Sequence, residues 1–188
     1  AGMPIISDPG EDLTLRCHEN GIQVCAVPGP SAFVTALAIS GMPSGRFTFE
    51  GFLSVSKPSR RKHLEELVNE KRTMIFYEAP HKLLATLEDM LSYFGNRSIA
   101  LVKELTKIHE TVFLTTIQEA INYFTENPPK GEYVLVIEGA KKEEKTEEFS
   151  LENAINLAKK LKADGLSTTA AAKEAASVKD LKKSDIYK

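Results

Sequence analysis

The sequence predicts an α/β fold with a mixed sheet, followed by a small helical module. Two patterns indicate this fold class. Up to Ala140, short apolar stretches typical of buried strands alternate with stretches that carry apolar residues at helical spacing. From Lys141 onwards no strand pattern occurs, and the apolar residues follow helical spacing alone.

The first part of the chain combines turn residues with one strand and two helices. Gly and Pro punctuate residues 1–10 and 28–30, so both stretches are predicted loops. Between these loops the sequence predicts a short helix that carries Leu13, Leu15 and Cys17 and ends near Gly21, and then a buried strand over 22–27. After the second loop it predicts a helix that Ser31 can cap and whose apolar residues are Phe33, Val34, Leu37 and Ile39. A strand, a Gly/Pro turn and a helix form a βα unit whose turn can face a ligand.

The middle of the chain repeats this alternation with more strands. The sequence predicts strands at 47–53, 73–77, 99–102, 111–115 and 133–137, helices at 60–71, around Leu83 to Leu91 and around Ile117 to Phe124, and a turn at 128–131. Some of these strands follow one another without a crossover helix, which parallel neighbours would require. We therefore expect a mixed sheet rather than a purely parallel one.

The pattern of the last part of the chain predicts a linker followed by a helical module. Residues 141–148 are almost all charged, which is typical of a solvated linker. Beyond it the sequence predicts a helix that carries Leu151, Ile155, Ala158 and Leu161, an Ala-rich helix capped by Ser167, and a third short helix that carries Leu181, Ile186 and Tyr187. Three short helices can form a helix-turn-helix module. We expect domains over 1–44, 45–140 and 150–188, with the linker at 141–149.

Composition limits the function classes. The 24 basic residues balance 26 acidic ones to a net charge of −2, which argues against a general polyanion binder but permits a local basic patch. Cys17 and Cys25 form neither a disulfide framework nor a metal-ligand spacing, which favours a reduced, cytoplasmic location and no metal. No transmembrane stretch, GxGxxG fingerprint or GxxxxGK[ST] loop occurs, so a membrane protein, a Rossmann dehydrogenase and a P-loop NTPase are disfavoured.

Several segments carry groups suited to a ligand, each with a plainer alternative. The glycines of residues 1–10 allow close backbone approach to a ligand, or belong to an ordinary loop. Residues 28–32 lie between a strand and a helix, and residues 77–81 end a strand and open a helix, which are places where open α/β sheets bind ligands. In the second segment Glu78 can bind a ligand, whereas His81 can simply face solvent. Residues 103–110 can supply a base or phosphate contacts, or form a solvated loop. The basic run at 57–63 suits a nucleic-acid backbone, or is the polar face of a helix.

Taken in order, these segments resemble a known family. AGMPIISDPGE, VPGPSA, FEGFL, RTMIFYEAPHKL and KELTKIHE are similar to the tetrapyrrole-methylase-type class of S-adenosylmethionine-dependent methyltransferases. FYEAPH and ELTKIHE most resemble the branch that methylates the ribose 2′-hydroxyl of a cytidine in bacterial small-subunit ribosomal RNA. The resemblance runs from Ala1 to about Ala140. It implies the remnant of a Rossmann-like N-terminal domain followed by a second α/β domain, so we expect an N-terminally truncated form of the enzyme.

The resemblance also implies roles for individual residues. The cofactor S-adenosylmethionine is expected against Ala1, Gly2, Met3, Ile6, Ser31, Ala32, Tyr77, Glu78, Ala79 and Gly139. Ribosomal RNA, free or in the small subunit, is expected against Lys103, Lys107 and Glu110, to which the motif analysis adds Arg60, Arg61 and His81. Glu104 or His109 is the expected base for the 2′-hydroxyl proton. A homodimer is the expected assembly.

Two other functions fit the same sequence. A methyltransferase of this family can act on a tetrapyrrole or another small molecule, which the nearly neutral charge favours. A noncatalytic module can instead bind RNA or a partner through its helical tail, although the tail alternates Lys with acidic residues and lacks a one-sided basic face.

Overall fold

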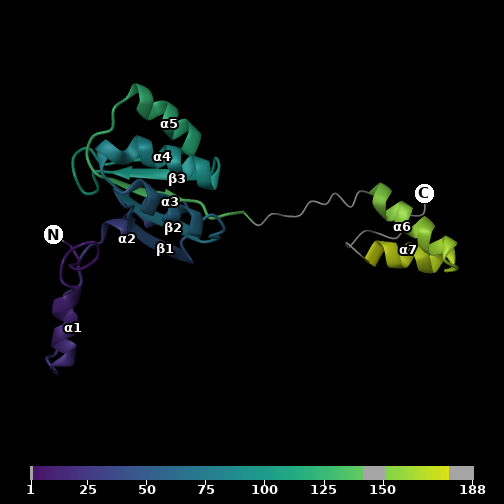
Figure 1. The fold of residues 1–188 in the computed structure, drawn as a ribbon, viewed down its shortest axis with the longest axis horizontal. Helices are drawn as coiled ribbons and strands as arrows, with labels where there is room; N and C mark the ends of the chain where they lie inside the picture. The colour runs from purple at the N-terminus through teal and green to yellow at the C-terminus, as the bar shows by residue number, and fades with distance from the viewer. Residues whose placement is uncertain (1, 142–150, 178–188) are drawn as a thin grey trace. The chain divides into compact units, whose positions relative to one another are not determined.

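The computed structural model describes residues 2–141 and 151–177 of the chain. The chain divides into two compact units, residues 1–140 and residues 141–188 (Figure 1). Each unit has its own apolar core and is described by itself. The further boundary that the sequence predicts between residues 44 and 45 stays a prediction. Within the two described ranges, no helix is both long and apolar enough to cross a bilayer.

A five-stranded mixed sheet organises the first unit, in the order β1-β2-β5-β3-β4. The strands are β1 (Phe47–Phe52), β2 (Thr73–Glu78), β3 (Ser98–Lys103), β4 (Thr111–Thr116) and β5 (Tyr133–Ile137). β1 and β2 are parallel, with the crossover helix α3 (Lys57–Glu66) between them, whereas β5 is antiparallel to both β2 and β3. β3 and β4 form an antiparallel pair. The predicted mixed α/β fold is confirmed.

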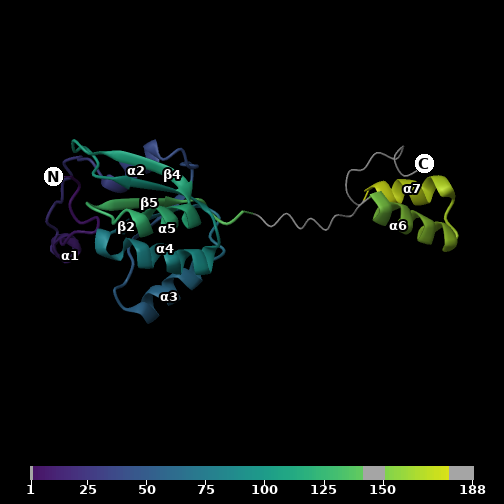
Figure 2. The same cartoon turned by 90° about the horizontal axis from the view of Figure 1, so that it is seen from above.

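Helices cover the two faces of this sheet unequally (Figure 2). α3, α4 (Pro80–Phe94) and α5 (Ile117–Glu126) cover one face, and their apolar side chains pack on alternate strand residues such as Met74 and Leu135. The other alternate residues, such as Ile75 and Val136, pack against α2 (Ala32–Ile39). Because α2 is a single short helix, apolar side chains on its side of the sheet stay exposed, including Leu114 at 60%.

The N-terminal segment contains the predicted short helix but not the predicted strand. α1 (Glu11–Glu19) forms, although it buries none of its side chains. The strand predicted over 22–27 is wrong, because a strand needs a neighbour for its backbone hydrogen bonds and this segment pairs with none of the described strands. Its apolar residues are exposed as a result, and Val27 reaches 85%.

The second unit contains two packed helices among its described residues. α6 (Leu151–Ala163) and α7 (Thr168–Ser177) confirm two of the helices predicted for the tail. Ala172 and Ala175 are buried against apolar side chains of α6. Ser167 caps α7 as predicted, since its hydroxyl oxygen accepts a hydrogen bond from Ala170 N at 3.3 Å. The third predicted helix and the charged linker, apart from Lys141, lie outside the described residues.

Candidate functional site

A cleft, here called the sheet-end cleft, lies where β2 and β3 end and β5 begins. Because β5 is antiparallel to both neighbours, its first residues lie beside the last residues of β2 and β3. The volume is about 470 Å³, within the range of small-molecule sites. The cleft is lined by Ile6, Ser7, Ala32, Phe52, Tyr77, Glu78, Ala79, Val102, Glu104, Leu105, Lys107, Glu132, Tyr133 and Val134.

Tyr77 fixes the wall of the cleft that α2 contributes. Strand alternation turns this residue to the α2 side of the sheet, where its ring lies 5.0 Å from that of Phe49 and 5.4 Å from that of Phe52. Its hydroxyl oxygen accepts a hydrogen bond from Phe33 N at 3.1 Å. Tyr77 therefore holds the start of α2 against the end of β2.

Glu78 is a buried carboxylate that the protein itself engages. The residue is 2% exposed, and its two oxygens accept hydrogen bonds from Thr86 Oγ1 at 2.6 Å and Ala79 N at 2.8 Å. Buried carboxylates need such partners because burial otherwise disfavours the charge. Glu78 thus orients the turn between β2 and α4 and lines the cleft.

Glu104 joins two loops at the mouth of the cleft. Its backbone has φ 52°, an unusual value for a residue other than glycine. Its carboxylate accepts hydrogen bonds from Glu132 N at 3.2 Å and Lys107 Nζ at 3.2 Å. Gly131 makes this approach possible, because a Cβ there would lie 2.5 Å from the Glu104 carboxylate. The Glu132 N–H and then the Lys107 ammonium lower the pKa of Glu104, so this carboxylate is a weakened base.

A second, shallower hollow of about 390 Å³ adjoins the cleft at Ile6. Here the loop near Met3 meets the Pro-Gly-Pro turn, since Met3 N donates to Pro30 O at 2.9 Å. Gly2 has φ 143°, and a Cβ there would lie 2.8 Å from Pro30 O, so this contact requires glycine. Ser31 lines this hollow at the N-cap position of α2, but its hydroxyl makes no capping hydrogen bond, contrary to prediction.

The structure brings together most of the residues expected to bind the cofactor. Ile6, Ala32, Tyr77, Glu78 and Ala79 line the sheet-end cleft, and Met3 and Ser31 line the adjoining hollow. Gly2 belongs to the loop that forms the hollow, and Ala1 lies outside the described residues.

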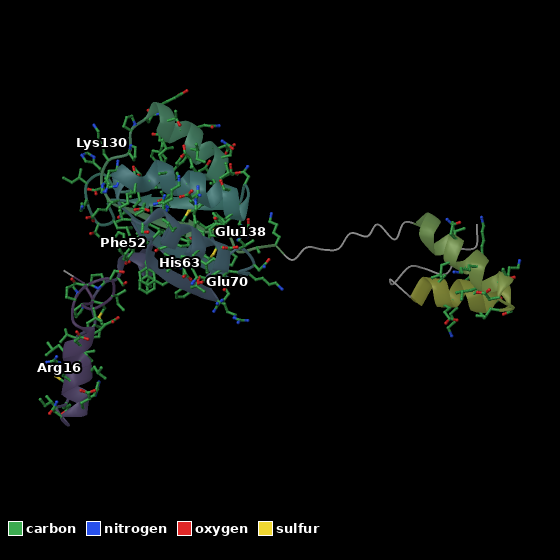
Figure 3. All side chains as sticks on the ribbon, in the orientation of Figure 1. Arg16, Phe52, His63, Glu70, Lys130 and Glu138 are labelled. Atoms are coloured by element: carbon green, nitrogen blue, oxygen red, sulfur yellow. The ribbon has the colours of Figure 1, made fainter. Side chains whose placement is uncertain are left out.

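Gly139 is not brought to this site. It lies two residues beyond the end of β5, whereas the cleft lies at the start of that strand, about 20 Å away for six extended residues. A Cβ at Gly139 would collide with the backbone of Lys71, so this glycine serves close packing at the other end of the sheet. Figure 3 shows Glu70 and Glu138 at that end, and Phe52 and Lys130 at the cleft end.

The expected RNA-contacting and basic residues are only partly gathered. Of the candidates, Glu104 and Lys107 line the cleft. Arg60 and Arg61 lie on α3, where Arg60 pairs with Asp89 of α4 at 2.7 Å and Arg61 approaches it at 3.7 Å. The other candidates do not line the cleft: His81 is exposed in the first turn of α4, Lys103 lies on the opposite face, and His109 and Glu110 lie on the exposed loop before β4.

The sequence patterns missed the part of the cleft that β5 and its preceding turn provide. Glu132, Tyr133 and Val134 reach the cleft through antiparallel pairing with distant strands, which a linear pattern does not record. The one available signal was the turn at 128–131 directly before a strand. In the part of the chain that the structure describes, no cluster of three His, Cys, Asp or Glu residues could hold a metal ion.

Comparisons with known proteins bear on the family of the chain. The family model for Tetrapyrrole (Corrin/Porphyrin) Methylases matches residues 1–121. Over 188 residues the chain is 46% identical to "Ribosomal RNA small subunit methyltransferase I" of Synechocystis, covering 100% of this chain and 67% of that protein. The protein of the same name from Halalkalibacterium halodurans is 41% identical over 189 residues, covering 100% and 65%. The chain thus spans about two thirds of the length of these curated relatives.

Solved structures share the fold at low sequence identity. The methyltransferase CobJ has a TM-score of 0.57 at 19% identity, covering 74% of this chain and 62% of that one. Uroporphyrin-III-C-methyltransferase from Thermus thermophilus has a TM-score of 0.51 at 21% identity, covering 72% and 60%. At these identities the likeness bears on the fold alone.

Proposed function

The chain belongs to the tetrapyrrole (corrin/porphyrin) methylase family, and from this premise we propose that it methylates the ribose 2′-hydroxyl of a cytidine in small-subunit ribosomal RNA. The observation that carries the proposal is the 46% identity, along the whole chain, to a protein named for methylation of small-subunit ribosomal RNA. The sheet-end cleft gives that likeness a site of suitable size. The two free cysteines support a cytoplasmic location.

We propose S-adenosylmethionine as the cofactor, because the lining of the cleft fits it. Apolar side chains such as Phe52, Val102 and Val134 suit its adenosine. When bound, this cofactor supplies an electrophilic methyl group. The residues that would hold it are Gly2, Met3, Ile6, Ser31, Ala32, Tyr77, Glu78 and Ala79.

The protein's main contribution to such a transfer is alignment of the 2′-hydroxyl. The residues of the cleft would have to present the 2′-oxygen to the methyl group that the bound cofactor would supply, and the hydroxyl proton would pass to a base of the protein or to solvent. Alignment alone contributes about 7–11 kcal/mol in well-oriented reactions. We propose that Lys107, held at the cleft by Glu104, contacts a phosphate beside the target nucleotide.

Glu104 and His109 are the two candidates for the group that accepts the 2′-hydroxyl proton. Glu104 lies at the cleft, but its lowered pKa and its two hydrogen bonds favour a positioning role. His109 retains its place as a proposed base on the neighbouring loop, although it does not line the cleft. Lys103, at the end of β3, and Glu110, on the loop before β4, are also proposed RNA contacts. His81, exposed beside Ala79, is a further proposed contact.

We also propose that the protein forms a homodimer. The support is the apolar surface of the edge strand β4 on the α2 side of the sheet, where Val112 is 39% exposed and Leu114 60% exposed. Exposed apolar side chains gathered on one face of a sheet are typical of association surfaces.

A methyl-transfer assay tests the proposed function. The protein is incubated with radiolabelled S-adenosylmethionine and small ribosomal subunits that lack the modification. We expect label in one ribosomal RNA nucleotide, joined to the next by a bond that resists alkaline hydrolysis, because 2′-O-methylation blocks that cleavage. Label on a base, or on a tetrapyrrole but not on RNA, would overturn the proposal and favour the small-molecule alternative.

A further inference from the structure

A third cavity lies at the same end of the sheet as the cleft but on the opposite face. This aromatic hollow has a volume of about 330 Å³ and lies between β3, β4, α5 and the turn at 128–130. The side chains that matter in it are Lys103, Phe113, Tyr123, Phe124, Lys130 and Tyr133. Tyr133 borders both the hollow and the sheet-end cleft, so the two cavities are neighbours across the end of the sheet.

Four aromatic rings form a connected cluster in the hollow, in which neighbouring rings are tilted or edge-on to one another. The ring centroids of Phe113 and Tyr123 lie 5.0 Å apart, those of Tyr123 and Phe124 5.1 Å, and those of Phe124 and Tyr133 5.6 Å. Phe124 and Tyr133 are buried, whereas Tyr123 is 49% exposed. The buried rings thus hold Tyr123 in place while part of it stays open to a ligand. A flat ligand can stack there at little cost in side-chain freedom.

The charged side chains that line the hollow are Lys103 and Lys130, and the Glu104 carboxylate of the cleft lies near enough to interact with Lys103. Lys103 lies at the end of β3 and Lys130 in the turn before β5, so they approach the rings from two different elements. The described residues that line the hollow include no Asp or Glu, whereas Glu78, Glu104 and Glu132 line the cleft. On a chain of net charge −2, this is a local site for an anion beside an aromatic surface.

We propose that the aromatic hollow binds one unpaired nucleotide of the RNA substrate, next to the nucleotide that enters the cleft. The inference rests on the proposed function. The base stacks on Tyr123 with its edge against Phe113, whose ring is inclined at 53° to that of Tyr123, and its phosphate lies between the ammonium groups of Lys103 and Lys130. Aromatic rings can reach base faces only where bases are unstacked, so the hollow selects single-stranded RNA. Adjacency through Tyr133 lets one strand cross from the cleft to the hollow.

The first test compares two substitutions at one position. Binding of the chain to a fluorescein-labelled single-stranded oligoribonucleotide is followed by fluorescence anisotropy. Tyr123→Leu should weaken binding about fivefold or more, because it removes a stacking surface, whereas Tyr123→Phe keeps the ring and should stay within about twofold. Equal affinity of Tyr123→Leu and the wild type would overturn the proposal. The exposure of Tyr123 makes both variants compatible with folding, which circular dichroism checks.

A second variant keeps the proposal testable if Tyr123→Leu does not fold. Lys130 is exposed in a turn, and Lys130→Gln should lower the slope of log Kd against log salt by about 0.7, the value for one phosphate contact on a single strand. An unchanged slope would count against the proposal. Photo-crosslinking of RNA that contains 4-thiouridine should label Phe113 or Tyr123, and labelling confined to cleft residues would contradict it.

A cleft variant separates failure of this inference from failure of the proposed function. If Lys107→Gln weakens RNA binding while Tyr123→Leu and Lys130→Gln do not, the hollow is not an RNA site but the RNA function stands. If the wild-type chain binds no RNA, both proposals fail. If the hollow variants weaken binding only to intact ribosomal subunits and not to naked RNA, the occupant is a ribosomal protein and the nucleotide proposal is wrong.

Discussion

At the scale of single residues, Glu104 is the clearest case of a side chain whose surroundings decide its role. A general base needs a pKa near the working pH and a lone pair that faces the reacting proton. Glu104 has a lowered pKa and accepts hydrogen bonds from Glu132 N and Lys107 Nζ. Its carboxylate is therefore charged throughout the neutral range, which suits it to hold an ammonium group rather than to collect protons.

Substitution of Glu104 distinguishes these roles. In Glu104→Gln, Lys107 loses its ionic partner, so the KM for RNA should rise about two- to tenfold while kcat changes little. Glu88→Gln is the control, because Glu88 is exposed on α4 and lines neither the cleft nor the hollows. Steady-state methylation kinetics with RNA as the varied substrate measure both constants. A fall in kcat of about 100-fold or more would identify Glu104 as the base instead.

Glu70 gives a pH-dependent contribution to stability. Its carboxylate accepts hydrogen bonds from Arg72 Nη2 at 2.6 Å and Arg72 Nε at 2.9 Å, and the Arg72 side chain and backbone N–H lower the pKa of Glu70 from 4.5 to about 2. A lowered pKa stabilises the fold fully above the unfolded value, and that stability is lost as the pH falls from about 4.5 towards 2. We expect urea unfolding to show a shallower acid dependence in Glu70→Gln. Carboxyl NMR titration should place the Glu70 midpoint below 3, and a midpoint near 4.5 would contradict the pairing.

At the scale of elements, local patterns predicted most of the fold. β2 and β5 carry continuous apolar runs because both of their faces are buried, and such runs can be read without knowing the partner strands. α3 begins at Lys57, before the predicted residue 60, because Pro58 is acceptable in the first turn of a helix. The same local reading fails for residues 22–27, because a strand depends on a partner that the pattern does not contain.

The candidate site was less predictable for the same reason. Loops rich in Gly, Pro and charged residues pointed to the cleft, and Ile6, Tyr77 and Lys107 do lie there. The contribution of Glu132 and Tyr133 depends on the register of β5 against β2 and β3, which is set by packing across the whole sheet. Motifs report which residues are chemically able to act, whereas register decides which of them meet.

The contact between α3 and α4 yields a prediction about Arg60. Arg60 Nε and Nη2 each donate to Asp89 Oδ2 at 2.7 Å, and both side chains are largely buried. Asp89→Ala leaves the guanidinium without this partner and should lower the free energy of unfolding by about 1–3 kcal/mol. Arg61→Ala should change it by less than about 1 kcal/mol, because Arg61 is half exposed and 3.7 Å from Asp89. Urea unfolding measures both values.

The same pair tests whether the basic run on α3 contacts RNA. Arg60→Met should lower stability while leaving the salt dependence of RNA binding unchanged, since its guanidinium already binds Asp89. A decrease in the salt slope of about 0.7 would instead show that Arg60 contacts a phosphate, as the sequence alone suggests.

At the scale of the whole molecule, the apolar surface on the α2 side predicts self-association. Val112 and Leu114 lie on the edge strand β4 and face away from α5, and edge strands favour pairing with another chain. Leu114→Lys should weaken self-association about tenfold or more, because it places a charge on that surface. Gln118→Lys adds the same charge to an exposed position of α5, which lies on the other side of the sheet, and should leave self-association unchanged. Sedimentation velocity at several concentrations measures both, and a wild-type chain that stays monomeric would contradict the proposed dimer.

At the same scale, the contribution of the helical tail to RNA binding distinguishes an enzyme from a noncatalytic binding module. The buried side chains described between α6 and α7 are alanines, so the tail has a small core, and its lysines alternate with acidic residues. A polyanion needs several positive charges on one face, which this pattern does not supply. Deletion of residues 150–188 should therefore leave affinity for single-stranded RNA within about twofold, whereas Lys107→Gln weakens it. A loss of about tenfold or more on deletion, with Lys107→Gln unchanged, would assign RNA recognition to the tail and leave the α/β unit as a scaffold.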